Sequence, residues 1–368
     1  MKEGWEYKKL GEVCKIYQPQ TIASSLLKED GKYPVFGANG MIGRYDSYNH
    51  EDPEVLLCCR GATCGAINVS LPFSWINGNA MVVKPINDSF LKSFLRYILL
   101  TLDYSHIITG AAQPQITRTS LSPVTVPVPT IIEQQSIVDY LDSAFAKIDA
   151  MKANAEKALN EAKALFQASL KEMLEPKEGW KEKKIKDIGS VIAGTTPNTN
   201  VAEYWDGSLC WISPAELDGS HYLYDSKKKI TEAAVKAKSL KLLPEGTVIL
   251  SSRAPIGKVV INKVPTYCNQ GFKCVVCGKD IYNEFLYWWF WGNTDYLNSL
   301  GTGATFKEIS KKVVEEITLP IPPIFEQQSI VAALDSLKSK VDCLHENYNK
   351  ISQECDALKQ AILRQVFE

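Results

Sequence analysis

The sequence predicts a mixed α+β fold with a pseudo-two-fold internal repeat, in which two α/β domains are separated by two long helices that pair as an antiparallel coiled coil. Three observations predict it. Short motifs recur at a shift of 193 residues, strand-like and helix-like segments follow the same order in both repeats, and each repeat ends in an unbroken helical pattern.

The internal repeat is clearest at Glu133–Val138, because the same six residues, Glu-Gln-Gln-Ser-Ile-Val, recur at Glu326–Val331. The repeats also begin alike, with Glu3–Trp5 and Glu178–Trp180 displaced by 175 residues. Because the shift grows from 175 at the start to 193 at the later motifs, the second repeat has about eighteen extra residues in its first half. A period this long indicates a duplicated domain rather than a solenoid. Further matched pairs are Val126–Pro129 with Leu319–Pro322, Gly110–Ile116 with Gly303–Ile309, Arg60 with Arg253, and Asn77 with Asn269.

Each repeat begins with a region that reads as mixed strand and helix. Continuous apolar runs predict buried strands, longer apolar segments predict helices, and Gly/Asn clusters predict turns. The expected strands are 55–59, 80–83, 247–250 and 274–276, the expected helices are 90–102 and 285–297, and the expected turns are 37–40 and 61–65. The aromatic run Tyr287–Trp291 is equivalent to 93–97 of the first repeat. We expect it in the core rather than on a base-stacking surface.

Each repeat ends in apolar or small residues at alternating steps of four and three, the spacing of a coiled-coil seam. Small residues in the first seam would face large ones in the second. The alternative is that each helix packs on its own domain. Prolines bound the helices at 129, 176, 322 and 323. The predicted segments are 1–130, 131–175, 176–323 and 324–368. The seam positions are Ile137, Leu141, Ala144, Ile148, Met151, Ala155, Ala158, Ala162 and Leu165, then Ile330, Leu334, Leu337, Val341, Leu344, Tyr348, Ile351, Cys355, Leu358 and Ile362.

Bulk composition indicates a globular protein of the cytoplasm. Hydrophobic content is 45% and charged content is 23%, and neither a membrane span nor a secretory signal is visible. The ten cysteines fit buried, reduced thiols better than disulfides. Cys274 and Cys277 have metal-ligand spacing but lack a second pair, so no metal site is expected.

Taken together, the motifs resemble the specificity (S) subunit of type I restriction–modification systems. The resemblance covers the whole chain and depends on the order and duplication of short motifs. It implies that each domain is a target recognition domain that reads one half of a bipartite double-stranded DNA site. It also implies that the helices set the spacing and dock two methyltransferase (M) subunits. Segments similar to those of the family's recognition domains are 33–40, 60–65, 211–217 and 252–257.

The resemblance further implies that chemistry belongs to the partners. Methyltransferase subunits would use S-adenosylmethionine, and restriction (R) subunits would cleave with ATP and Mg²⁺. The sequence itself has no G-x-G-x-x-G loop after a strand, no phosphate loop at Gly257–Lys258, no ligand-spaced histidines and no paired carboxylates. We therefore expect no catalytic residues and no cofactor in this chain.

The charge balance allows DNA binding only if folding gathers the basic residues. The net charge is −1. Residues 1–132 carry 12 basic and 11 acidic side chains, and residues 176–325 carry 19 and 16. The helical segments are acidic, with 5 basic and 8 acidic side chains in 133–175 and 5 and 7 in 326–368. A partner could supply further phosphate contacts.

Candidate DNA-binding residues are polar side chains on Gly-rich loops, where Arg, Gln and Asn can meet base edges and Thr, Ser and Lys can meet phosphates. Because Arg60 and Arg253 occur in both repeats, they fit shared structure or phosphate contact better than base choice. Two other functions remain open: a coiled-coil scaffold that binds only proteins, and a fused restriction–methylation enzyme. The candidates are Asn39, Arg44, Tyr45, Arg60, Gln113, Gln115, Thr117 and Arg118 in the first repeat, and Thr195, Thr196, Ser213, Arg253, Thr302, Thr305 and Lys307 in the second.

Overall fold

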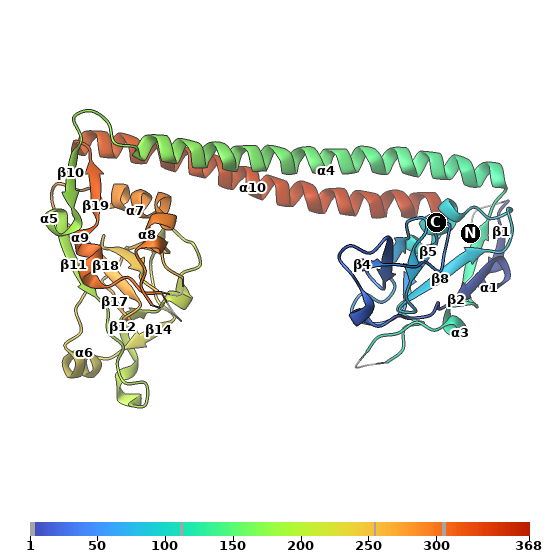
Figure 1. The fold of residues 1–368 in the computed structure, drawn as a ribbon, viewed down its shortest axis with the longest axis horizontal. Helices are drawn as coiled ribbons and strands as arrows, with labels where there is room; N and C mark the ends of the chain where they lie inside the picture. The colour runs from blue at the N-terminus through green and yellow to red at the C-terminus, as the bar shows by residue number, and fades with distance from the viewer. Residues whose placement is uncertain (1–3, 111–112, 254, 304–306) are drawn as a thin grey trace. The chain divides into compact units, whose positions relative to one another are not determined.

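The computed structural model describes residues 4–110, 113–253, 255–303 and 307–368 (Figure 1). The chain divides into two compact units. Unit 1 contains Met1–Glu156 and Tyr348–Glu368, and unit 2 contains Lys157–Asn347. The divisions fall inside the two long helices, α4 (Ile131–Leu174) and α10 (Ile324–Phe367). Each unit therefore consists of one α/β domain and a part of both long helices.

Unit 1 is built on a four-stranded sheet in the order β2-β8-β5-β6, with a three-stranded sheet β4-β3-β7 beside it and the antiparallel pair β1-β9. The central strand β5 and the first four residues of β8 are apolar, which buries them on both faces. Helix α2 covers this sheet. The strands are β1 (Glu6–Lys9), β2 (Cys14–Tyr17), β3 (Tyr33–Gly37), β4 (Gly40–Tyr45), β5 (Val55–Cys58), β6 (Ile67–Val69), β7 (Trp75–Ile76), β8 (Ala80–Pro85) and β9 (Thr125–Val128). The helices are α1 (Leu10–Val13), η1 (Ser24–Leu26), α2 (Lys92–Thr101) and α3 (Arg118–Leu121).

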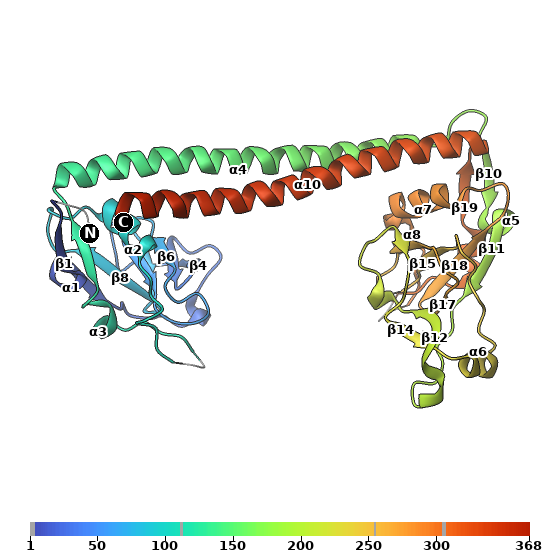
Figure 2. The ribbon, with the colours of Figure 1, turned by 180° about the vertical axis from the view of Figure 1, so that it is seen from behind.

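Unit 2 repeats this plan with a five-stranded sheet β11-β18-β15-β16-β13, a three-stranded sheet β14-β12-β17 and the pair β10-β19. Helix α7 lies between the larger sheet and the long helices (Figures 1 and 2). The strands are β10 (Lys181–Lys184), β11 (Gly189–Ala193), β12 (Trp205–Ile212), β13 (Tyr222–Leu223), β14 (Lys228–Ile230), β15 (Val248–Ser251), β16 (Val259–Asn262), β17 (Tyr267–Cys268), β18 (Phe272–Cys277) and β19 (Thr318–Ile321). The helices are α5 (Ile185–Ile188), η2 (Ala202–Tyr204), η3 (Pro214–Glu216), α6 (Glu232–Lys238), α7 (Asn283–Gly292), α8 (Thr294–Ser299) and α9 (Lys311–Glu316).

Strand pairing confirms the internal repeat and locates the extra residues of the second copy. β3 pairs antiparallel with β4 and parallel with β7, and β12 pairs in the same way with β14 and β17. The connection between β3 and β4 is two residues long, whereas η3 and β13 lie between β12 and β14. Helix α6 lengthens the next connection, from β14 to β15. The insertion therefore lies in the first half of unit 2, as the sequence predicts.

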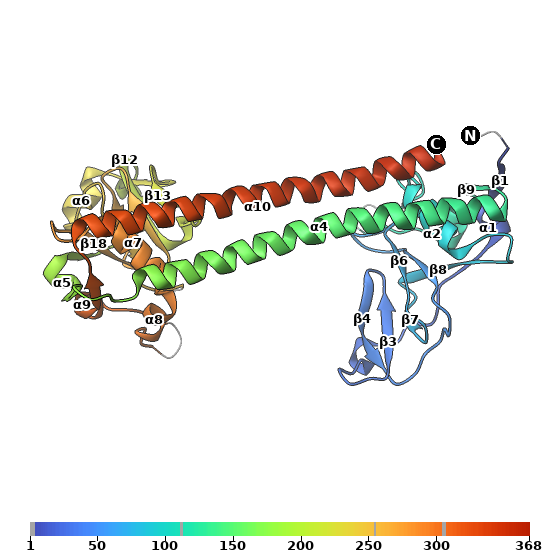
Figure 3. The same ribbon diagram turned by 90° about the horizontal axis from the view of Figure 1, so that it is seen from above.

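The long helices run antiparallel where unit 1 contains both (Figure 3). Lys359 of α10 bonds to Asp149 of α4 at 2.5 Å, and Lys152 of α4 bonds to Asp356 of α10 at 3.2 Å. From Asp149 to Lys152 the residue number rises along α4, while that of the bonded residue in α10 falls from 359 to 356. The two helices are therefore antiparallel here. In unit 2, parts of both helices join one core with the sheet and α7; they contribute Phe166, Leu170 and Leu174 from α4 and Ile330, Val331 and Leu334 from α10.

The predicted seam needs a correction at five positions, because Met151, Ala158, Leu165, Leu344 and Leu358 are exposed. In α4 the buried side chain is often the next one along the chain: Val138 after Ile137, Leu159 after Ala158, and Phe166 after Leu165. Each helix buries one face against its own domain as well as against the other helix. The buried stripe is therefore rotated and wider than a strict seam. Mutual packing and packing on the domain, posed as alternatives by the sequence, both occur.

The second aromatic helix also differs from its predicted range. The sequence predicts one helix over 285–297, but α7 ends at Gly292 and α8 begins at Thr294. Asn293 leaves the helical region between them, with φ −111° and ψ 27°. Four residues of the aromatic run, Tyr287–Phe290, are buried as predicted, and Trp291 is half-buried. The equivalent segment of the first repeat is 96–100 rather than the predicted 93–97, a displacement of three residues. Trp288 matches Tyr97, because each donates a hydrogen bond to an aspartate of a long helix.

Candidate nucleic-acid interface

The repeated Glu-Gln-Gln motif fixes each long helix to its domain through the first glutamine. The Gln134 side chain is fully buried, accepts from the Leu91 backbone N–H at 2.8 Å, and donates to the carbonyls of Ser89 and Pro129. Gln327 repeats all three bonds: its Oε1 accepts from Tyr282 N–H at 2.7 Å, and its Nε2 donates to the carbonyls of Asp280 and Pro322. The motif is therefore structural, and it sets the angle at which the helix leaves each domain.

A second pair of matching bonds lies eight residues, about two helical turns, further along each long helix. Tyr97 of α2 donates to Asp142 of α4, and Trp288 of α7 donates to Asp335 of α10 at 2.9 Å. These bonds join the helix that covers the sheet to the long helix. The sheet, the covering helix and the long helix consequently form one rigid frame in each unit, to which the loops are attached.

A loop with the same paired base is attached to this frame in both units. In unit 1, Thr109 and Gln115 bond to each other through their backbones, at 2.9 and 2.8 Å, and close a short hairpin. Gln115 also bridges to Arg60, which follows β5. In unit 2, Thr302 and Glu308 form the same pair at 3.1 and 2.9 Å, and Glu308 bridges to Arg253 after β15. We call 109–115 and 302–308 the hairpin loops.

The first residue inside each hairpin loop is a glycine with positive φ, +88° at Gly110 and +125° at Gly303. A side chain at Gly110 would bring its Cβ to 2.5 Å from the Gln113 carbonyl oxygen. The turn therefore requires glycine, which explains why this residue is kept in both repeats. The loops share a backbone frame and carry different polar side chains.

Among the sequence candidates, those on or beside the hairpin loops are the most accessible. Arg60, Gln113, Arg118, Thr302 and Lys307 are exposed, and Gln115 and Arg253 are half-buried. Thr305 lies outside the described residues. Thr117 caps α3, since its hydroxyl accepts from Ser120 N–H at 3.1 Å, so its side chain is committed to local structure.

The candidates on the smaller sheets divide in the same way. Asn39 is exposed at the β3–β4 turn, and Thr195 is exposed after β11. Four others have local partners. Arg44 donates to the carbonyls of residues 31 and 32, Tyr45 packs edge-on against residue 75, Thr196 bonds to residue 270, and Ser213 caps η3 with residue 216.

Sequence reasoning missed the buried charged clusters. In unit 1, the buried Glu54 carboxylate lies 2.7 Å from Lys84 Nζ and 3.0 Å from Lys92 Nζ. In unit 2, Glu284 is buried against His221 at 2.7 Å and accepts from Tyr222 at 3.2 Å. A charged residue at the edge of an apolar run was the only available signal, and it does not identify a partner distant in sequence.

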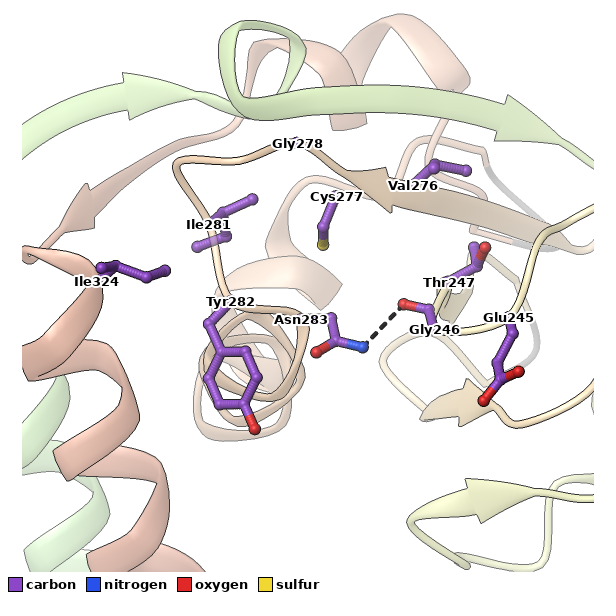
Figure 4. Close-up of a pocket in the computed structure, with 10 residues that line it drawn as sticks. All are labelled: Glu245, Gly246, Thr247, Val276, Cys277, Gly278, Ile281, Tyr282, Asn283 and Ile324. Carbon is purple, nitrogen blue, oxygen red and sulfur yellow. Dashed lines mark hydrogen bonds between the residues drawn. The ribbon is translucent and has the colours of Figure 1, made fainter.

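A pocket of about 290 Å³ in unit 2 lies where unit 1 has its Glu54 cluster (Figure 4). By strand register, Thr247 takes the place of Glu54 and Val276 that of Lys84. Asn283, the counterpart of Lys92 at the start of the helix, donates to the Gly246 carbonyl at 3.0 Å across the pocket. The pocket thus marks a place where neutral side chains replace a charged triad. The Cys277 thiol also lines it, and burial raises the pKa of that thiol, which keeps it protonated.

The described residues contain no group of three or more His, Cys, Asp or Glu side chains that could hold a metal ion. Within the same described ranges, no helix combines the length and apolar character needed to cross a membrane. The geometry offers one frame in each unit with exposed polar side chains on or beside the hairpin loop: Arg60, Gln113 and Arg118 in unit 1, and Thr302 and Lys307 in unit 2.

The family model for the type I restriction modification DNA specificity domain matches this chain twice, at residues 2–161 and 177–353. The chain belongs to this family. The two matches correspond to the two repeats, so this specificity-domain protein contains the family's domain in duplicate.

Curated relatives of this family member are specificity subunits. The chain is 40% identical over 196 residues to the type I restriction enzyme MjaIX specificity subunit of Methanocaldococcus jannaschii. That match covers 52% of this chain and 44% of the relative, so it spans less than half of the relative's length. The chain is also 29% identical over 279 residues to the EcoR124I/EcoR124II specificity subunit of Escherichia coli, covering 72% of this chain and 68% of that one.

Solved structures share the fold of this family member. A chain from a study of complex assembly and conformational transition in a type I R-M system aligns with a TM-score of 0.77 at 19% identity, covering 100% of this chain and 98% of that one. The HsdS subunit of Thermoanaerobacter tengcongensis aligns with a TM-score of 0.62 at 17% identity, covering 100% and 97%. At these identities the likeness establishes the fold alone.

Proposed function

We propose that this chain is the DNA-recognition subunit of a type I restriction–modification complex, and that each α/β domain reads one half of a bipartite double-stranded site. The observation that carries the proposal is the hairpin loop, built on the same frame in both units and furnished with different polar side chains. A conserved frame with variable side chains is what two readers of different half-sites require. Arginine and glutamine can pair with guanine and adenine edges in the major groove.

The docking of two methyltransferase subunits is part of the proposal, and it is supported by a repeated exposed apolar pair. Ile131 and Ile132 begin α4, and Ile324 and Phe325 occupy the matching positions at the start of α10. Ile132 is 80% exposed and Phe325 is 78% exposed. Large apolar side chains this exposed, at the same place in both repeats, suit a partner that binds twice.

The long helices would set the spacer between the half-sites. Support comes from their continuity, since α4 and α10 each contain 44 residues without interruption, and from their fixed attachment through Gln134 and Gln327. A helix attached rigidly at its end transmits a change in its length to whatever it carries.

Catalysis and cofactors are assigned to partner subunits in this proposal. The methyltransferase subunits would carry S-adenosylmethionine, and restriction subunits would use ATP and Mg²⁺ for cleavage. The chain itself would be a non-catalytic specificity subunit without a cofactor. The purified chain alone should therefore transfer no methyl groups from S-adenosylmethionine to DNA, and clear transfer would contradict this assignment.

The proposed function is tested by selecting bound sequences from a pool of random duplexes, using the full chain co-purified with a type I methyltransferase subunit. We expect two short enriched blocks separated by a spacer of fixed length and free sequence. Affinity for the selected duplex should fall at least tenfold between 50 and 200 mM salt, because phosphate contacts release counterions (about 10³-fold for six contacts). A stable complex that enriches no sequence would instead identify a protein-binding scaffold.

A further inference from the structure

Beneath the hairpin loop of unit 2 lies a buried lysine. Lys273 is on β18, an interior strand of the larger sheet, and its side chain is 6% exposed. Its Nζ lies 3.0 Å from Ser252 Oγ, 3.2 Å from the Gln270 carbonyl oxygen and 3.1 Å from Glu308 Oε1. An ammonium group has three donors, so these three acceptors satisfy it completely. A charge in this position is stable only while the acceptors stay in place.

Glu308 connects this lysine to the hairpin loop. Its backbone closes the loop against Thr302 and bridges to Arg253, while its side chain turns inward to Lys273. Glu308 is 43% exposed, so its carboxylate lies at the boundary between core and solvent. The position of the loop base therefore depends on the ion pair that holds Glu308 toward the core.

Unit 1 builds the same place without charge. Leu57 pairs with Met81 as Leu250 pairs with Lys273, so Met81 is the counterpart of the lysine. The bridges to Arg60 and Arg253 make Gln115 the counterpart of Glu308. Ile116 N–H bonds to the carbonyl of Cys59 as Ile309 N–H bonds to that of Ser252, which matches the third member. Methionine, glutamine and cysteine thus replace lysine, glutamate and serine together.

We propose that Lys273 is a positioning residue for DNA recognition by unit 2: through Glu308 it fixes the base of the hairpin loop, where Glu308 pairs with Thr302, and thereby determines how strongly one half-site is bound. This inference rests on the proposed function. The full replacement of the cluster in unit 1 shows that either complete set of side chains can occupy this place, and we expect a mixed set to weaken the support of the loop. In a mixed set a charged group loses its partner, and it would move the loop base toward solvent.

The test compares Lys273→Met with the double variant Lys273→Met/Glu308→Gln, which recreates the unit 1 pair. Each full-length variant is co-purified with the methyltransferase subunit and assayed on three duplexes: the selected site, and the same site with one or the other half randomised. Lys236→Met, at an exposed position on α6, is the matched control.

For Lys273→Met we expect at least tenfold weaker binding to the selected site, with the loss confined to the half-site read by unit 2. Randomising that half should then cost the variant little, while the other half keeps its full contribution. The double variant should bind within about threefold of the original chain, and so should the control. Tryptophan fluorescence, which reports mainly on unit 2, shows whether the second domain remains folded.

Three results would overturn the inference: unchanged affinity of Lys273→Met, an equal loss in both halves, or a folded double variant that binds no better than Lys273→Met. If Lys273→Met does not fold, Glu308→Gln provides the test. It keeps the lysine and weakens only its link to the loop, so a loss restricted to the same half-site is expected, and full affinity would overturn the inference. Absence of sequence-dependent binding by the original complex would instead overturn the proposed function.

Discussion

At the scale of single residues, the two buried glutamines explain why one motif is unchanged between the repeats. Gln134 and Gln327 each satisfy one backbone N–H and two carbonyls that would otherwise be buried without partners. Only an amide side chain offers both a donor and an acceptor at this length. Selection on the loops can therefore vary each recognition surface without moving the helix that leaves it.

We predict that Gln327→Ala lowers the free energy of unfolding of unit 2 by about 2–3 kcal/mol, because it leaves buried backbone groups unpaired. Urea unfolding followed by tryptophan fluorescence measures the change. Gln328→Ala, at the exposed neighbouring position, is the matched control and should shift it by less than about 0.5 kcal/mol. Equal effects of the two substitutions would show that the buried bonds contribute nothing.

The Glu284 cluster predicts a pH dependence for unit 2. Burial raises the pKa of the Glu284 carboxyl, but the hydrogen bond and charge of His221, together with Lys263 and Tyr222, lower it, and the net pKa lies below its ordinary value of 4.5. Because the folded state binds this proton more weakly, the contribution to stability is complete above pH 4.5 and is lost as the pH falls toward the folded pKa.

Glu284→Gln should therefore lower the urea midpoint of unit 2 at pH 7, and the difference from the original chain should shrink as the pH falls below about 4.5. Tryptophan fluorescence in urea at a series of pH values measures both. A constant difference across this range would mean that the carboxylate is not the source of the stabilisation.

At this scale the sequence indicates which residues matter more readily than what they do. Repetition between the two halves identified Gln134, Arg60 and the hairpin loops. It could not distinguish a buried structural residue such as Gln134 from an exposed residue such as Arg60. Two of the DNA-binding candidates also have local partners at helix starts: the Thr117 hydroxyl caps α3, and Ser213 N–H donates to Glu216 at η3. Partners distant in sequence, such as Lys273 and Glu308, have no signature in a single chain.

At the scale of elements, α4 and α10 are helices with two neighbours rather than one. Phe166 of α4 packs edge-on against Trp288 and Trp291 in unit 2, and the ring centroid of Phe367 of α10 lies 5.6 Å from that of Phe94 in unit 1. A helix that buries a face on both a domain and another helix needs a wider apolar stripe than a coiled-coil seam. The rotated seam follows from this.

A matched pair of leucines tests the corrected seam. Leu159 is 4% exposed and Leu165 is 62% exposed, although the predicted seam includes Leu165 and omits Leu159. We predict that Leu159→Ala lowers the free energy of unfolding by about 2–4 kcal/mol, the usual cost of a cavity in a packed site. Leu165→Ala should change it by less than about 0.5 kcal/mol. If urea unfolding shows a larger loss for Leu165→Ala than for Leu159→Ala, the seam predicted from the sequence is correct and the corrected one is wrong.

Element type and order were predictable because helical spacing persists over many residues and proline bounds it. The ends were less predictable. The break at Asn293 between α7 and α8 follows from its own backbone conformation, and an aromatic run that is buried on all sides gives no periodic signal for it. Strand pairing located the inserted residues, which the sequence could assign only to half of a unit.

At the scale of the whole molecule, duplication separates two tasks. The buried glutamines Gln134 and Gln327, the helix that covers the sheet and the base of the hairpin loop are common to both units, whereas the loop side chains differ. Under the proposed function, each half-site could then change by substitution within one unit, and the spacer could change through the helices. This separation is visible in the sequence as repetition, and its physical basis is the pair of equivalent frames.

Adding seven residues within Ala153–Ala162 of α4, with a matching heptad in α10, should lengthen the spacer between half-sites by about three base pairs, from roughly 10.5 Å of added helix. Sequence selection on the variant complex measures the spacer. A heptad in α4 alone should abolish selection of any fixed spacer, since the helices no longer match. An unchanged spacer in the double insertion would exclude the helices as its determinant.

The most direct measurement exchanges residues 1–130 for the corresponding domain of another member of the family and repeats the selection from random duplexes. If each unit reads its own half of the site, one enriched block should change while the second block and the spacer length stay as they were. Change in both blocks, or in neither, would contradict independent reading by two units.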